Sequence, residues 1–412
     1  RLFDEDIGAP GKVALGSIDS TEVVDGSTVR FNFGTINSAI RAVFVDQFMV
    51  DKNQAEADTL GMAGEGTGPF KLVEYVTGDR VVMTAYDGYW ESGDDGDSLP
   101  YLDGVTVRIL PDATALFTAL ITGVVDTHWQ MNPEFVTQLD ADSPAGYGDT
   151  GFQTGFNGNL FEWDEGIFSD NFARQALMHT IDRESVVYAG YGDLAVANPT
   201  NSNFPPTGPF TNPDVQAYAY DRDKAQGMWD TIRADWDDNK GGFPGLELMF
   251  CGVCGFGPPS LVIAKNLQDV LGGRSAAISI NLAALGLSSV RMRRSQRQEL
   301  GRYDWDHDGF TYPNIRFTTT EPNNTLVGWE CGAHWASNFC DEELDSYSIA
   351  GRETYDPAGR KDAYFKYQLR YREIIPAFNW AMRSITHGVS NRLHNLVSNF
   401  GTLEYADAYI SK

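Results

Sequence analysis

One acidic segment of this chain has a spacing of carboxylates that is close to a metal-binding motif. Asp304–Gly309 has carboxylates at its first, third and fifth positions and a glycine at its sixth, as the start of a calcium-binding loop does. The twelfth position, which should hold a glutamate, is Ile315, and Pro313 interrupts the segment. We therefore interpret the segment as the acidic end of a strand, and the sequence predicts no metal site.

Motifs for catalysis are also missing. The glycine-rich stretch Gly64–Gly68 precedes a predicted strand instead of opening a helix, so it does not form a phosphate cradle. The six histidines include no HExxH pair, and no Gly-x-Ser-x-Gly elbow occurs. Carboxylates are so common that no single pair indicates glycoside hydrolysis. The sequence predicts a protein that binds a ligand without converting it, with no catalytic residue and no cofactor.

The four cysteines form two local pairs, Cys251 with Cys254 and Cys331 with Cys340. Three pairings are possible for four cysteines, and the sequence alone does not choose among them. Glycines and prolines directly follow Cys254, so no helix begins there as a thioredoxin-like site would require. We expect structural disulfides in an oxidising compartment, above all Cys331–Cys340.

Composition narrows the function further. The 412 residues include 57 acidic and 31 basic side chains, which gives a formal net charge of −26. Nucleic acids and anionic membrane surfaces attract basic proteins, so this balance excludes a nucleic-acid partner. No apolar run reaches the ~18 residues that a membrane-spanning helix needs. An acidic surface of this kind also suits a compartment exposed to high salt, where charges are screened.

Strands and helices alternate along the chain, which predicts an α/β fold with more than one domain, since single cores rarely exceed ~300 residues. In residues 1–150 we expect a strand at 29–33, a hairpin at 70–75 and 80–85, a strand at 105–110 and a short strand at 124–125. Asp112 should cap a helix that ends at Gly123.

After residue 150 the pattern changes, and strand–helix–strand order recurs, which suggests a second α/β lobe. Ser169 precedes an amphipathic helix, Asp182 caps the next one, and Asp356 with Pro357 opens the last long helix, which runs to about Glu373. Further helices are expected around 225–236 and at 261–271, followed by a strand at 278–285. Residues 376–412 return to strands and loops.

Several short motifs along the chain, by their sequence and by the order in which they occur, resemble those of the dipeptide/oligopeptide/nickel-type extracellular solute-binding proteins of ABC importers, family 5. The clearest are the hairpin segment 66–75, GTGPFKLVEY, the helix motif 172–177 with 181–184, and the segment 338–345. Weaker similarities cover 89–90, 100–103, 107–113, 123–126 and 303–304. Together they extend over nearly the whole chain.

This resemblance implies a two-lobed periplasmic-binding-protein fold of the large peptide-binder type, with hinge strands between the lobes. Residues 1–150 would form the remainder of lobe I, 151–375 lobe II, and 376–412 the return to lobe I. Family members begin with a strand-rich segment that would precede Arg1. We therefore expect this sequence to lack the N-terminal part of lobe I and the signal peptide of an exported, periplasmic or extracytoplasmic protein.

The resemblance also implies where the ligand binds. Gly309, Phe310, Thr311 and Tyr312 match the pocket-lining segment of relatives, and Pro313 lies about where peptide binders have an acidic anchor. The other candidate ligand contacts are Trp129 and Gln130, which follow the 123–126 motif, and Trp380 and Arg383 on the returning segment. Arg383 has two interpretations, a pair with a ligand carboxylate or an ion pair between lobes.

The leading hypothesis is a monomeric binding protein that delivers a small peptide-like or oligosaccharide-like ligand to an ABC importer permease by lobe closure. The alternative within the family is a metal-chelate binder of the nickel type. The alternative from another class is a secreted carbohydrate-active enzyme that uses two of the many carboxylates.

Overall fold

The structure is a computed structural model of the chain. It describes residues 15–44, 50–51, 53–54, 66–149, 155–161, 163, 166–192, 197–200, 202–205, 208–243, 245–251, 257–271, 281–285, 307–311, 314–316, 321–322, 326–332, 339–399 and 402–411. The chain divides into two compact units. Unit 1 comprises Arg1–Ala9, Phe44–Phe152 and Ser384–Lys412, and unit 2 comprises Pro10–Val43 and Gln153–Arg383.

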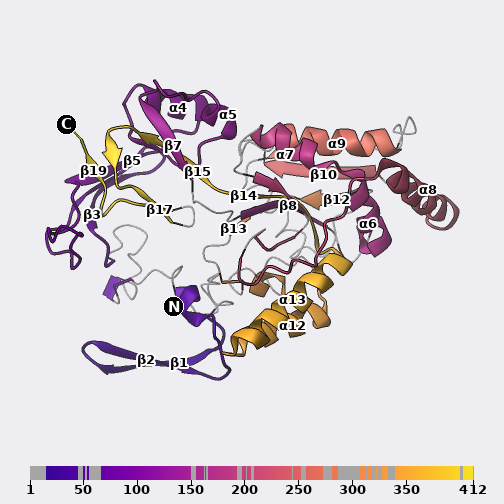
Figure 1. Ribbon diagram of the computed structural model, residues 1–412, viewed down its shortest axis with the longest axis horizontal. Helices are drawn as coiled ribbons and strands as arrows, with labels where there is room; N and C mark the ends of the chain where they lie inside the picture. Colours follow the sequence, from indigo (N-terminus) through magenta and orange to yellow (C-terminus); the bar gives the residue numbers. More distant parts are fainter. Residues whose placement is uncertain are drawn as a thin grey trace. The chain divides into compact units, whose positions relative to one another are not determined.

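Unit 2 is built on a mixed sheet with the strand order β11-β10-β12-β8-β14-β9 (Figure 1). Its strands are β8 (Gly155–Phe161), β9 (Ala197–Pro199), β10 (Gly245–Cys251), β11 (Asn281–Leu285), β12 (His307–Thr311) and β14 (Ala377–Arg383), while β13 (Asn314–Arg316) pairs with β8. β10 runs parallel to β11 and β12, whereas β8 is antiparallel to β12 and β14. Parallel neighbours need a crossover connection, and helix α9 (Gly257–Leu271) lies between β10 and β11 in the chain.

Most helices of unit 2 begin directly after an aspartate. Its carboxylate accepts a hydrogen bond from a backbone N–H of the first turn, which stabilises a helix by ~1 kcal/mol and favours the positive end of the helix dipole. These pairs are Asp170 with α6 (Asn171–Thr180), Asp182 with α7 (Arg183–Tyr191), Asp221 with α8 (Arg222–Asn239), Asp341 with α12 (Glu342–Arg352) and Asp356 with α13 (Pro357–Ile374). The predicted caps Asp182 and Asp356 are confirmed, and α6 is capped by Asp170, one residue after Ser169.

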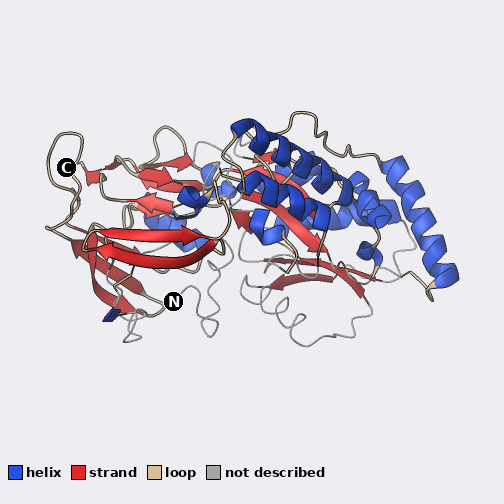
Figure 2. Ribbon diagram, turned by 90° about the horizontal axis from the view of Figure 1, so that it is seen from below, coloured by secondary structure: helices blue, strands red, loops and turns tan. Residues whose placement is uncertain are grey.

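Two clusters of buried side chains hold unit 2 together. One packs α6, α7, α8 and α9 onto β8 and β14, with the fully buried Trp229 and Trp380 at its centre. Figure 2 shows these helices stacked beside the strands of the sheet. The other cluster packs α13 against the short helix η6 (Val327–Trp329) through aromatic rings. Burial of each large ring stabilises the fold by on the order of 2–3 kcal/mol, because its apolar surface is removed from water.

The motif at residues 172–177 contains a buried arginine, Arg174, whose contacts show what this residue does in the fold. Arg174 of α6 is 3% exposed, and its guanidinium stacks on the Trp163 ring at 3.8 Å. The same group donates hydrogen bonds to the backbone carbonyls of Phe168, Ser169 and Ile374. Burial lowers its pKa to about 10. Arg174 therefore ties the start of α6 to the end of α13, and its role is structural.

Unit 1 consists of small antiparallel sheets and short helices. Its sheets are β3-β4-β5 (Phe70–Val76, Arg80–Ala85 and Gly104–Arg108), β6-β15-β7 (Thr127–His128, Thr386–Ser390 and Ala145–Asp149), β16-β19 (Leu393–His394 and Tyr409–Ile410) and β17-β18 (Val397–Asn399 and Thr402–Glu404). Helix α4 (Ala113–Ile121) is capped by Asp112 as expected, and α5 (Pro133–Val136) follows β6. The C-terminal segment thus supplies the middle strand of the β6-β15-β7 sheet.

The structure differs from the sequence prediction at several points. The expected half-buried strand at 29–33 is β2 (Thr28–Phe33), which forms an exposed hairpin with β1 (Ile18–Asp25). Val124 lies in a bend and Val125 in a loop after α4, and the strand starts at Thr127. Unit 1 resumes at Ser384, directly after β14, which is hydrogen-bonded to β8 of unit 2.

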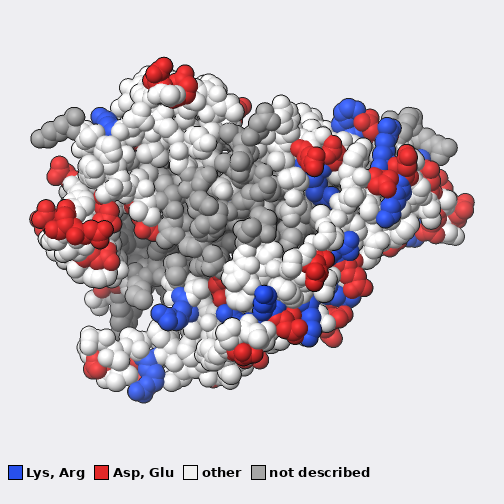
Figure 3. Space-filling model, viewed as in Figure 1, with Lys and Arg blue, Asp and Glu red and all other residues white. Residues whose placement is uncertain are grey.

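Figure 3 shows one dense group of acidic residues at the left edge of the view, while acidic and basic residues alternate at its right. Among the described residues no helix is long and apolar enough to cross a membrane.

The expected disulfide between Cys331 and Cys340 is present, and it joins the segment after η6 to the residue before Asp341. Cys251 ends β10, and Cys254 lies outside the described residues. The bridge spans a sequence separation of 9. Removing a cross-link of this length is expected to lower the free energy of unfolding by about 2 kcal/mol.

This is measured by urea unfolding of the wild type with and without reducing agent, beside the double variant Cys331→Ser/Cys340→Ser. The double variant should unfold at the midpoint of the reduced wild type. Two thiols that react with an alkylating agent in the unreduced native protein at these positions would contradict the pairing.

Candidate functional site

The predicted ligand contacts fall on both units. Trp129 and Gln130 follow β6 in unit 1. In unit 2, Gly309, Phe310 and Thr311 belong to β12, and Trp380 and Arg383 belong to β14. Tyr312 lies outside the described residues.

Within unit 2 the sheet brings two of the predicted segments next to one strand, since β12 and β14 are both hydrogen-bonded to β8. Phe310 is paired with Phe161 near one end of β8, and Arg383 with Gly155 at the other end. The Trp380 side chain is only 1% exposed and belongs to the core cluster. In this structure it supports the sheet, and its ring is not accessible to a solute.

In unit 1 the segment that carries Trp129 is held along β15. Gly388 and Val389 pair with His128 and Thr127 of β6. Beyond that pairing, the Met131 N–H donates to the Thr386 carbonyl at 2.9 Å, and the Thr386 hydroxyl donates to the Met131 carbonyl at 2.9 Å. The segment is therefore fixed on both sides of Trp129.

A glycine allows this close approach. A Cβ atom on Gly388 would lie 2.5 Å from Leu120 Cδ2 and 3.1 Å from both His128 Cβ and Met131 Sδ. The first distance is shorter than real Cβ contacts, and the other two are tight. A larger residue at position 388 would therefore require the Leu120 side chain to move and would crowd His128 and Met131 on either side of Trp129.

Gln130 has an unusual backbone conformation. Its φ is +52°, in the left-handed region that side-chain-bearing residues adopt at a cost of ~1 kcal/mol. Its backbone N–H donates to His387 Nδ1 at 3.2 Å. Its side-chain nitrogen Nε2 is buried and has no hydrogen-bond partner among the described residues. A buried amide donor without a partner costs ~1–3 kcal/mol, so Gln130 would gain stability if its side chain turned outward to an acceptor on a ligand.

Trp129, beside it, is 53% exposed, while His128 and Met131 are 3% and 2% exposed. A large exposed ring next to an unused amide donor can stack on a planar or apolar part of a ligand while the amide orients a polar part. This combination is the ligand-binding geometry that the described residues of unit 1 offer.

His128 is buried in the same segment, and burial lowers its pKa from 6.5 to about 4. In the unfolded chain the imidazole takes up a proton as the pH falls through 6.5, but in the folded chain it does so only near 4. The free energy of unfolding of unit 1 should therefore fall as the pH is lowered from 6.5 to 4, by about 2 kcal/mol at pH 5.

Urea unfolding between pH 7 and pH 4.5 measures this effect, and His128→Leu should remove this part of the pH dependence. An unchanged slope in that variant would mean that other groups cause it.

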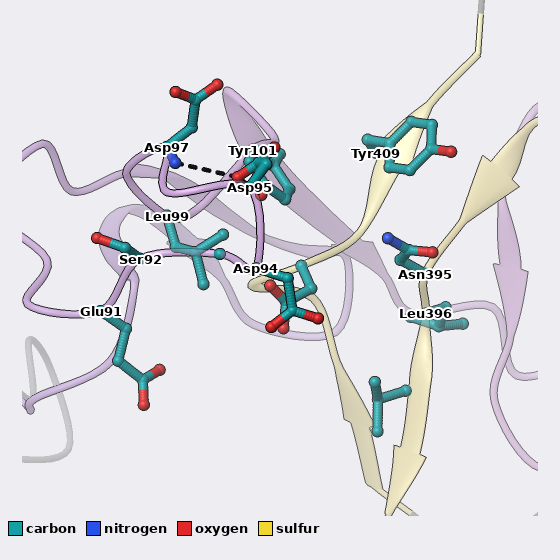
Figure 4. A pocket seen from close by; sticks show the side chains of 13 residues that line it. Glu91, Ser92, Asp94, Asp95, Asp97, Leu99, Tyr101, Asn395, Leu396 and Tyr409 are labelled. Atoms are coloured by element: carbon teal, nitrogen blue, oxygen red, sulfur yellow. Dashed lines mark hydrogen bonds between the residues drawn. The ribbon is translucent and has the colours of Figure 1, made fainter.

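A separate acidic hollow of about 850 Å³ lies elsewhere in unit 1 (Figure 4). Its described lining includes no Lys or Arg, and it consists of Glu91, Ser92, Gly93, Asp94, Asp95, Asp97, Leu99, Tyr101, Asn395, Leu396, Val397, Asp407 and Tyr409. The Tyr101 hydroxyl donates to Asp95 at 2.5 Å, which lowers the pKa of Asp95 and raises that of Tyr101 to about 12. The hollow attracts cations in general, since its carboxylates face solvent without a basic partner.

No described group of three or more His, Cys, Asp or Glu residues is arranged to hold a metal ion. The carboxylates of the hollow are thus too dispersed to form a coordination site.

Sequence reasoning missed His387 and the acidic hollow. His387 lies 257 residues from Gln130, so no local spacing links the two. The hollow combines residues 91–97, an acidic stretch in the sequence, with residues 395–397, 407 and 409 near the C-terminus, and no local pattern links the two.

Comparison with known proteins gives the same family as the sequence motifs. The model for bacterial extracellular solute-binding proteins, family 5 middle, matches residues 1–320. Heme-binding protein A of Haemophilus influenzae is 28% identical over 220 residues, and the dipeptide-binding protein of Escherichia coli is 26% identical over 221 residues. Each match covers 51% of this chain and 38% or 39% of the relative, so the chain spans about two fifths of the length of these curated relatives.

Solved structures show the same fold. The periplasmic binding protein AgaA from A. tumefaciens R10 in complex with agropinic acid has a TM-score of 0.81 at 20% identity, over 100% of this chain and 82% of that one. The dipeptide-binding protein from Pseudoalteromonas sp. SM9913 in complex with Met-Leu has a TM-score of 0.80 at 19% identity, over 99% and 79%. The chain has the α/β fold of these two-lobed periplasmic binding proteins. Since the family model covers more than half of its residues, the chain belongs to the bacterial extracellular solute-binding proteins of family 5.

Proposed function

We propose that this protein is an extracytoplasmic solute-binding protein that delivers a small peptide-like or oligosaccharide-like ligand to an ABC importer. The observation that carries the proposal is the pair formed by the exposed Trp129 ring and the buried, unpartnered Nε2 of Gln130. Such a pair supplies a stacking surface and a directed donor, and the described site residues include no catalytic constellation. Family membership supports the same interpretation.

The ligand class follows from the donors and from the relatives. An amide donor suits a carbonyl, carboxylate or hydroxyl oxygen, and peptides and sugars both carry these groups. Relatives are named for dipeptides and haem, and structural neighbours hold agropinic acid or Met-Leu. Arg383 and the β12 segment Gly309–Thr311 are proposed as contacts from unit 2, where Arg383 would pair with a ligand carboxylate.

Transport requires that the bound and free proteins differ. We propose that the ligand binds one of these forms more tightly and so shifts the population toward the form that the permease recognises. The protein would act as a monomer outside the cytoplasm and would release the ligand chemically unchanged.

A thermal-shift screen tests this function. The panel consists of di- and tripeptides, oligosaccharides, opines and nickel or iron chelates, followed by calorimetry on each hit. A ligand present at 100 times its Kd should stabilise the protein by about 2.7 kcal/mol. Saturable one-to-one binding without turnover supports the proposal.

Two outcomes would overturn it. Release of product from an oligosaccharide or peptide at catalytic rates would favour the enzyme class. Binding restricted to metal chelates would favour the nickel-type alternative, which the neighbouring structures of NikA proteins make a necessary comparison.

A further inference from the structure

We propose that His387 is a positioning residue for ligand binding: its Nδ1 accepts the Gln130 N–H and so holds the backbone turn that presents Trp129 to solvent. The effect of His387 on ligand affinity rests on the proposed function, whereas its hydrogen bond with Gln130 lies within unit 1. His387 itself is 1% exposed and does not reach a solute.

The turn at Gln130 is what orients Trp129. In a regular strand, side chains alternate between two faces, so Trp129 and Met131 would point to the same side. Here Trp129 is 53% exposed and Met131 is 2% exposed. The left-handed φ of +52° at Gln130 breaks the alternation, and this allows an exposed tryptophan to sit between two buried neighbours.

The left-handed backbone conformation of Gln130 needs a compensating interaction. The conformation costs ~1 kcal/mol for a residue with a side chain, and the hydrogen bond to His387 returns a similar amount. The Gln130 N–H donates this bond to His387 Nδ1 at 3.2 Å. An acceptor nitrogen carries no proton, so in neutral His387 the ring proton is on Nε2.

The position of His387 is itself well determined. It belongs to the central strand β15, where it pairs with Gly148 of β7, and its neighbour Gly388 pairs with His128 of β6. The backbone of His387 is therefore fixed within a strand that is paired on both edges, and the same strand pairs with the segment that precedes Trp129.

Two amide substitutions separate this role from simple packing. His387→Asn places an acceptor oxygen close to the position of Nδ1, whereas His387→Gln places it one bond further along the side chain. Both are neutral and polar, so they differ mainly in whether the acceptor meets the Gln130 N–H.

The first readout needs no ligand. Hydrogen–deuterium exchange of the full chain, followed by mass spectrometry of peptides covering 126–131, should show Gln130 protected in the wild type and in His387→Asn. In His387→Gln the exchange should be faster by about three- to tenfold. Exchange of the wild-type Gln130 amide at the rate of an unstructured peptide would overturn the proposal without any variant.

The second readout is the Kd for the hit of the thermal-shift screen. His387→Gln should raise the Kd about three- to tenfold, and His387→Asn should stay near the wild-type value. Equal behaviour of the two variants in both readouts would show that His387 only fills space. If the wild type binds nothing in the panel, the proposed function fails, while the exchange experiment still decides the role of His387.

Discussion

Replacing Arg174 by methionine is expected to lower the free energy of unfolding of unit 2 by about 4 kcal/mol. The methionine keeps most of the length of the side chain but removes the guanidinium that donates to the carbonyls of Phe168 and Ile374 in buried hydrogen bonds and to that of Ser169 in a partly buried one. Each unpaired buried group costs ~1–3 kcal/mol, and the stacking on Trp163 is lost as well. Urea unfolding monitored by tryptophan fluorescence and circular dichroism measures the change.

The matched control is Arg30→Met. Arg30 forms an exposed ion pair with Glu22, with its side chain 57% exposed, so its loss should change stability by less than about 0.5 kcal/mol. Because the two units can unfold in separate steps, only the transition of unit 2 should move. If Arg174→Met had the same free energy of unfolding as the control, the guanidinium would not stabilise the packing of α6 against α13.

Replacing Trp129 by alanine is expected to raise the Kd of the ligand about 100-fold and to leave the melting temperature of the ligand-free protein nearly unchanged. An aromatic ring at the centre of a binding site contributes ~2–4 kcal/mol, while removing a half-exposed ring costs little stability. Calorimetric titration with the hit of the screen and thermal melts without ligand test both parts.

Trp90→Ala is the matched control, since Trp90 is also in unit 1 and is 75% exposed. It should leave the Kd unchanged. A large loss of stability in Trp129→Ala without ligand would show that the ring supports the fold, and an unchanged Kd would remove Trp129 from the site.

The helical part of unit 2 could be predicted from local patterns. The amphipathic helix expected after Ser169 is α6. Ala173, Ala176 and Leu177 of its expected apolar face are fully buried, whereas Phe172 of the same face is 39% exposed. Caps such as Asp182 and Asp356 depend on neighbours three residues away or fewer, so the sequence contains all the information they need.

Burial and pairing between distant segments could not be predicted in the same way. The alternating pattern of residues 29–33 indicates one apolar face, but it does not tell whether anything covers that face, and β2 is exposed along its length. Trp380 has the same residue type as Trp129, yet its strand lies inside a sheet covered by helices. The bond between Gln130 and His387 depends on how β15 inserts between β6 and β7, which no local spacing encodes.

The acidic hollow of unit 1 has a consequence for how the protein responds to its medium. Its lining carboxylates repel one another, and none of the described lining residues is basic. Dissolved cations then screen this charge, and they do so more strongly as the ionic strength rises. Part of the charge balance of this fold is therefore set by the salt outside the protein, and a fresh-water and a saline environment would give the same chain different stabilities.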